Sequence, residues 1–176
     1  MDQAVLPLSS TDQDSGAGSL TPPQTLEAYW LTAYGSPGLG STNTTYIVGH
    51  SSDVLDSAFN NFSSQARVGD QLTITTADGP RLYQVHTVST ENKNTLKDSH
   101  IWAKVPGGLV LVSCHTSDLW GTNIIIEASP VNPTANAGQD GRVSSPGRPG
   151  RFRPHRGVSV ARSHRRGHPA GRLRQR

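Results

Sequence analysis

The amino-acid sequence predicts an all-β protein, a closed or partly closed barrel with one or two short helices. Three observations predict this fold class. Short runs of β-branched and aromatic residues recur through residues 20–130, and an Asp-Gly pair joins two of these runs as in a tight hairpin. Apolar residues recur at helical spacing in a short stretch after residue 50. Short strands that alternate with turns are typical of small barrels.

The chain divides into three parts by composition. We expect residues 1–19 to form a flexible N-terminal segment, because the stretch from 9 to 24 is rich in Ser, Thr, Asp, Gly, Gln and Pro. Residues 20–130 form one domain, which is large enough to fold without disulfides. Residues 131–176 form a tail rich in Arg, Gly and Pro with few apolar residues, and we expect this tail to be disordered.

The charge of the chain is distributed unevenly. Residues 1–134 hold five basic and twelve acidic residues, a net charge of −7, whereas residues 135–176 hold eleven arginines and one aspartate, a net charge of +10. Such a tail could bind an anionic polymer or surface through charge alone, and we expect no specific nucleic-acid partner. The tail also resembles an out-of-frame reading of a GC-rich gene, which would have no function. The sequence leaves both interpretations open.

The first predicted strand covers residues 26–34, and a loop rich in Gly and Pro at 35–40 ends it. A second strand at 44–49 leads directly to His50. A short helix is expected next, with Ser51 or Ser52 as its N-cap. Its apolar positions recur at helical spacing and are Val54, Leu55, Ala58, Phe59 and Phe62.

Two alternating runs follow, at 71–76 and 81–89, and the turn between them contains Asp78 and Gly79, a strong hairpin signal. A long loop at 90–105 comes after them, and loops of this length are often functional. The most apolar part of the chain then predicts two buried strands, at 109–114 and 123–128.

Cys114, the only cysteine of the chain, ends the first of these buried strands. A lone cysteine cannot form an internal disulfide. A thiol at the tip of a core strand is a candidate nucleophile, because the sheet holds it in place and the adjoining loop lets a substrate reach it. The alternative is an inert thiol that fills space, since free cysteines are among the most buried residues.

His50 is the candidate partner of this thiol. It also follows the end of a short apolar strand, where Gly49 lets the backbone bend. An imidazole there could lower the pKa of the cysteine and give a proton to a leaving amine. We expect His86, His100 and His115 to be packing or surface residues. Scattered histidines and one cysteine show no zinc-ligand spacing, so we expect no metal and no cofactor.

Several of these segments resemble the sortase family. Residues 110–114 (Val-Leu-Val-Ser-Cys) are similar to its Thr-Leu-x-Thr-Cys signature, and residues 48–50 (Val-Gly-His) to its Gly-His element. Residues 68–72 (Val-Gly-Asp-Gln-Leu) resemble the family's x-Gly-Asp-x-Ile segment. The resemblance covers about residues 20–128 and is nearest to the actinobacterial class E and class F groups. It implies a sortase-like β-barrel.

The resemblance also implies a reaction and its partners. Cys114 would attack a carbonyl of a sorting-signal peptide similar to Leu-Pro-x-Thr-Gly, and His50 would protonate the departing amine. The thioacyl enzyme would then be resolved by an amine acceptor or by water, as in a cysteine transpeptidase or thiol hydrolase. Sortases act at the extracellular face of the membrane or in the cell wall of Gram-positive bacteria. We expect the protein to be a monomer.

One departure from the family pattern bears on activity. Sortases carry an arginine in or near the strand after the cysteine, but here no Arg or Lys follows Cys114 until Arg142. Asn123 lies in that region and could donate one hydrogen bond to an oxyanion. The alternative function is therefore a catalytically impaired domain that binds a peptide or cell-wall material. The expected substrate-binding residues are Ser113, which stands where the family has threonine, Trp120 and Trp102.

Nothing in the sequence predicts a membrane anchor. It contains no run of about 18 apolar residues, the length that a spanning helix needs. The N-terminus lacks a positively charged start, and its short apolar run is interrupted by Pro7, so we expect no signal peptide in this chain.

Overall fold

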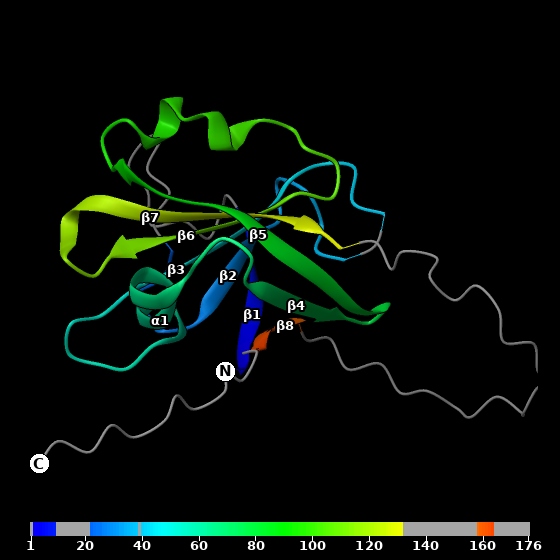
Figure 1. Ribbon diagram of the computed structural model, residues 1–176, viewed down its shortest axis with the longest axis horizontal. Coiled ribbons are helices and arrows are strands. Elements are labelled where there is room, and N and C mark those ends of the chain that lie inside the picture. Colours follow the sequence, from blue (N-terminus) through cyan, green and yellow to red (C-terminus); the bar gives the residue numbers. More distant parts are fainter. Residues whose placement is uncertain (1, 10–21, 39, 132–157, 164–176) are drawn as a thin grey trace, which may run out of the picture.

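The computed structural model describes residues 2–9, 22–38, 40–131 and 158–163, the last of these by their backbone. Seven strands curl into a half-barrel, and an eighth closes it in the order β1-β2-β3-β6-β7-β5-β4-β8 (Figure 1). This confirms the all-β prediction. The strands are β1 Asp2–Leu8, β2 Ala28–Leu31, β3 Thr45–Gly49, β4 Gln71–Thr76, β5 Gly79–Asn92, β6 Leu109–His115, β7 Asp118–Pro130 and β8 Val158–Ser163. The helical elements are α1 Ala58–Gln65 and two 3₁₀ turns, η1 Leu96–Asp98 and η2 His100–Trp102.

The first strand lies in the segment that the sequence predicted to be flexible. Strand β1 pairs in parallel with β2, and its side chains Val5 and Leu8 are only 3% and 2% exposed. That prediction gave more weight to the polar residues from 9 onward than to the short apolar run at residues 4–8. Burial of two aliphatic side chains and backbone pairing along the strand favour order over flexibility.

A second difference concerns the tail. Strand β8 lies within the part predicted to be disordered, and it pairs with both β1 and β4. Its sequence, Val-Ser-Val-Ala-Arg-Ser, has the β-branched residues typical of strands. Pairing on both edges satisfies its backbone groups, which composition alone does not reveal. Most of the arginine-rich stretch that suggested an anionic partner lies outside the described residues.

The pairing of β3, β6 and β7 decides where the candidate residues lie. Strand β3 runs parallel to β6, with Val48 opposite Val112. Strand β6 runs antiparallel to β7, with Cys114 opposite Asn123. The ends of β3 and β6 therefore lie at the same end of the sheet. His50 and Cys114 each lie two residues beyond Val48 and Val112, the last pair between these two strands.

Successive side chains on these strands point to opposite faces. One face encloses the barrel interior, where Ile47, Leu109 and Leu111 join a core that includes α1. The other face carries Tyr46, Val48, Val110, Val112 and Ile125, and these pack with Leu96 and Ile101 of the connection from β5 to β6. In Figure 1 this connection passes over the top of the sheet. Continued alternation places His50 and Cys114 on this second face.

Helix α1 is shorter than predicted. It begins at Ala58, where the Ser57 side chain caps it by accepting a hydrogen bond from the Asn60 backbone N–H. The Ser52 hydroxyl instead accepts hydrogen bonds from the backbone N–H groups of Val54 and Leu55, which stabilises a turn. Val54 and Leu55 are 82% and 56% exposed. Their apolar character extended the helical pattern in the sequence beyond the helix itself.

Candidate functional site

The site lies where β3 and β6 end, and Gly49 is needed there for close packing. A Cβ atom at position 49 would lie 2.2 Å from Cε2 of Phe59, an aromatic ring that α1 buries in the barrel. Gly49 does not have a positive φ, so the predicted bend is not its purpose. The glycine instead lets helix α1 pack directly behind the residue that carries the imidazole.

Ser113 joins the two strand tips from the barrel side. Its Oγ donates a hydrogen bond to the Gly49 carbonyl at 2.8 Å, and the Ser51 hydroxyl lies 2.9 Å from it. Because the Ser113 proton is given to the carbonyl, Ser51 is the donor in the second bond. Ser113 is 4% exposed. The structure therefore places this hydroxyl beneath the site, where it fixes the two strands to each other.

Replacing Ser113 with alanine should lower the free energy of unfolding by about 1–3 kcal/mol, because the buried Gly49 carbonyl loses its partner. The S113T variant retains the hydroxyl and is the matched control, so it should lose less. Chemical denaturation of the three proteins measures this difference. Equal stability of S113A and the unchanged protein would contradict the role given to this hydroxyl.

His50 is half-buried, and a backbone carbonyl orients its ring. Nε2 lies 3.1 Å from the carbonyl oxygen of Pro22. A carbonyl can only accept, so Nε2 carries a proton and Nδ1 is the nitrogen left to exchange a proton with the thiol. The pKa of His50 is raised, chiefly by its hydrogen bond with Cys114 and further by the Pro22 carbonyl, while burial opposes the shift.

Cys114 shows the complementary shift. The pKa of its thiol is lowered, first by the hydrogen bond with His50, with burial acting in the opposite direction, and then by a hydrogen bond and charge from Lys93. Both shifts favour an imidazolium beside a thiolate. The two groups titrate as a pair, so their protons are lost in two shared steps.

Lys93 is the member of the site that the sequence analysis missed. Its Nζ lies 3.3 Å from Sγ of Cys114 and also donates to the Leu119 carbonyl. Lys93 immediately follows β5, and the pairing of Glu91 with Asn123 brings this strand end beside Cys114. Its position in a long polar loop before the cysteine gave the only available signal, and that signal was too weak to distinguish it from other surface lysines.

Comparison with known proteins identifies the family of the chain. The family model of the sortase domain matches residues 4–131, most of the chain. The chain belongs to the sortase family. A search of curated proteins gave no match.

Solved sortases share the fold. Sortase A from Corynebacterium diphtheriae is 20% identical with a TM-score of 0.51, over 62% of this chain and 50% of that one. A lid mutant of the same protein is 21% identical with a TM-score of 0.53, over 66% of this chain and 63% of that one. Sortase C1 of Streptococcus agalactiae is 16% identical with a TM-score of 0.51, over 63% of this chain and 56% of that one. The chain thus spans between half and two thirds of the length of these sortases.

The other residues predicted for the sortase site lie in different surroundings. Asn123 is the direct cross-strand partner of Cys114 but is only 7% exposed. Trp120, near the start of β7, is 92% exposed. Trp102 donates from Nε1 to the Leu96 carbonyl at 2.6 Å, and its ring stacks against Tyr34. Trp102 therefore lies in an aromatic cluster with Tyr34 and Tyr46.

Three histidines stay outside this arrangement. His86 is exposed, and its Nδ1 lies 3.0 Å from Thr87 Oγ1. His100 contacts Glu127 at 3.3 Å on the surface. Nδ1 of His115 accepts a hydrogen bond from the Ser117 backbone N–H at 3.3 Å.

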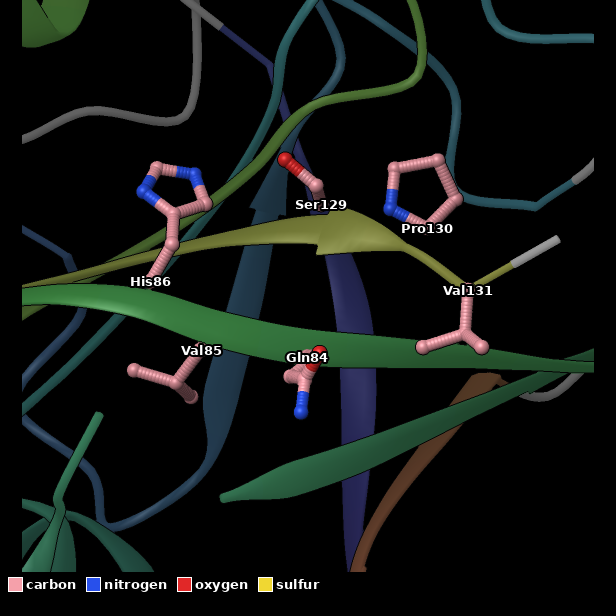
Figure 2. A pocket seen from close by; sticks show the side chains of 6 residues that line it. All are labelled: Gln84, Val85, His86, Ser129, Pro130 and Val131. Carbon is pink, nitrogen blue, oxygen red and sulfur yellow. The ribbon is translucent and has the colours of Figure 1, made fainter. Parts of the chain in front are cut away.

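A hollow of about 500 Å³ lies against β5 and β7, around His86 and Ser129 (Figure 2). It is six residues along β7 from Asn123 and so does not coincide with the thiol.

In the ranges that the structure describes, no helix is long and apolar enough to cross a membrane. Those same ranges contain no group of three or more His, Cys, Asp or Glu residues placed to hold a metal ion.

Proposed function

We propose that this protein is a cysteine transpeptidase of the sortase type, with Cys114 as nucleophile and His50 as its proton-transfer partner. The observation that carries the proposal is the meeting of these two side chains at neighbouring strand ends, where the imidazole lowers the pKa of the thiol and the thiol raises that of the imidazole. A purely structural cysteine has no need of such a partner. The family match supports the same assignment.

In the proposed reaction, the thiolate of Cys114 attacks the carbonyl carbon of the scissile amide. A C–S bond forms and the carbonyl π electrons move to oxygen, which gives a tetrahedral oxyanion. As this intermediate collapses, the C–N bond breaks and the imidazolium of His50 gives its proton to the departing amine. The acyl group remains on sulfur as a thioester.

The second half of the reaction restores the enzyme. An acceptor amine, or water, attacks the thioester carbonyl and passes a proton to His50. The C–S bond then breaks and the thiolate is released. Because His50 donates a proton in one step and accepts one in the other, a pKa near the working pH suits both steps.

The substrate and setting of the reaction follow from the family resemblance. The donor would be a sorting-signal peptide similar to Leu-Pro-x-Thr-Gly, the acceptor an amine at the surface of a Gram-positive bacterium, and the group nearest to class E or class F. The exposed ring of Trp120 is the proposed peptide contact on β7. Trp102 would contact a peptide that continues over the aromatic cluster, and Asn123 would donate to the oxyanion. We propose that Ser113 positions the strands and does not touch the peptide.

Incubation with Leu-Pro-x-Thr-Gly peptides in which x is varied tests the proposal. Intact mass spectrometry should show the chain plus the peptide portion up to threonine, and hydroxylamine should remove this adduct because it cleaves thioesters. An added amine should yield the transfer product. If no peptide of this pattern forms an adduct while the thiol alkylates readily, the proposed substrate class is wrong.

A further inference from the structure

The lysine beside the thiol supplies a positive charge that β7, the strand after Cys114, lacks. Nζ of Lys93 approaches Sγ to 3.3 Å and also donates to the carbonyl of Leu119 at the start of β7. An ammonium has three N–H donors, so one remains after these two contacts. The side chain is half-buried, where charge is screened less than at the surface.

We propose that Lys93 is a catalytic residue that stabilises the thiolate of Cys114 and then the oxyanion formed when the thiolate attacks. This inference rests on the proposed function. During the attack, negative charge leaves sulfur and appears on the carbonyl oxygen, which is bonded to the same carbon that sulfur is joining. A donor already within 3.3 Å of sulfur needs only a small movement to follow that charge. Lys93 would therefore do the work that the family assigns to an arginine on the following strand.

The surroundings of Lys93 hold it in this position. Its backbone N–H donates to the Gly121 carbonyl at 2.9 Å, so the main chain is attached to the same part of β7 as the side chain. Asp118 stabilises this first part of β7 by accepting from the Gly121 N–H at 2.9 Å and from the Thr122 hydroxyl at 2.6 Å. A preformed donor of this kind requires little rearrangement when the substrate arrives.

A structural role would also explain the contact with the Leu119 carbonyl, and it makes a different prediction. A lysine that only holds the start of β7 would affect stability without changing the ionisation of Cys114. The contact with sulfur has a consequence for the thiol itself, because removing the charge removes one of the groups that lower its pKa. The pH dependence of thiol reactivity therefore separates the two roles.

The test compares K93M, which removes the charge at similar length, with K93R, which keeps it. K97M is the matched control, because Lys97 is an exposed lysine of η1 and lies outside the site. The rate of alkylation by iodoacetamide is measured against pH, and since Cys114 is the only cysteine the signal has one source. The rate of thioester formation with Leu-Pro-x-Thr-Gly peptides is measured in the same proteins.

We expect thioester formation to fall by about 10²–10³-fold in K93M, as for loss of one oxyanion donor. The alkylation midpoint of K93M should move to higher pH, K93R should retain the low midpoint, and K97M should match the unchanged protein. Thioester formation in K93M at the unchanged rate would overturn the assignment. If the unchanged protein forms no thioester with any peptide, the proposed function fails separately. The alkylation midpoint then decides alone: an upward move in K93M supports the contact of Lys93 with the thiolate, and no move overturns it.

Discussion

Replacing Cys114 with alanine should abolish the covalent peptide adduct and reduce transfer of the peptide to an amine to the uncatalysed background. The chain has no other cysteine, so no second thiol can take over the attack. The expected loss is larger than for any other single change, because the nucleophile itself is removed and no thioester can form. Intact mass spectrometry and chromatography of the transfer product measure the two effects.

The C114A protein must remain folded for this result to be informative. Cys114 is half-buried at the tip of β6, and the core residues Val110 and Val112 precede it on the same face. We therefore expect thermal unfolding of C114A close to that of the unchanged protein. An adduct that persists in C114A would show that another group carries the acyl chain and would exclude Cys114 as the nucleophile.

Replacing His50 with glutamine should reduce kcat/KM by about 10²–10⁴-fold, the usual contribution of general acid–base catalysis. Glutamine preserves a hydrogen-bonding side chain but cannot carry a proton to the leaving amine. It also removes the largest influence that lowers the pKa of Cys114, so the thiol of H50Q should ionise at higher pH. Steady-state kinetics and alkylation against pH measure both consequences.

The pH profile of the unchanged protein follows from the same pair of shifts. Activity should fall at acidic pH as the thiolate is protonated, and the lowered pKa of Cys114 moves this limb to lower pH. Activity should fall at alkaline pH as His50 loses its proton, and its raised pKa moves that limb to higher pH. The active range should therefore be wider than the ordinary pKa values of a thiol and an imidazole suggest, and H50Q should lose its alkaline limb.

His86 provides the control for H50Q, because its exposed ring contacts Thr87 and lies outside the site. The H86Q variant should retain the kinetics and the pH profile of the unchanged protein. Equal loss of activity in H50Q and H86Q would indicate a general effect on folding. Full activity in H50Q would contradict the assignment of the proton-transfer step.

The sequence was sufficient to predict the barrel, and its pattern placed His50 and Cys114 near the ends of two short apolar strands. Parallel pairing of β3 with β6 brings these two strand ends to the same end of the sheet. The sequence also predicted the turn with Asp78 and Gly79. Gly79 adopts a positive φ of 105°, a conformation that glycine favours in such turns. These features depend on local patterns of polarity and conformation.

Lys93 could not be found in this way, because its place depends on the register between two long strands. Strand β5 was expected to end near residue 89 but continues to Asn92, where it pairs with Thr122. The polar residues of this extension look like loop in the sequence. Only the pairing of β5 with β7, and of β7 with β6, brings the lysine to the sulfur.

The strands at the edges were missed for a related reason. Strands β1 and β8 gain their stability from each other and from β2 and β4, partners that are distant in the sequence. Composition described each segment alone and therefore predicted flexibility. The family match, which begins at residue 4, agrees that the N-terminal strand belongs to the domain.

The most direct test of the imidazolium–thiolate pair is the rate at which iodoacetamide alkylates Cys114 in the unchanged protein, followed from acidic to alkaline pH. Because this is the only cysteine, the curve reports a single sulfur. We predict a midpoint well below that of an ordinary thiol, about 8.5, with rapid reaction persisting below neutral pH. A curve that rises only near the ordinary value would show that neither His50 nor Lys93 holds a thiolate, and the catalytic assignment would be wrong.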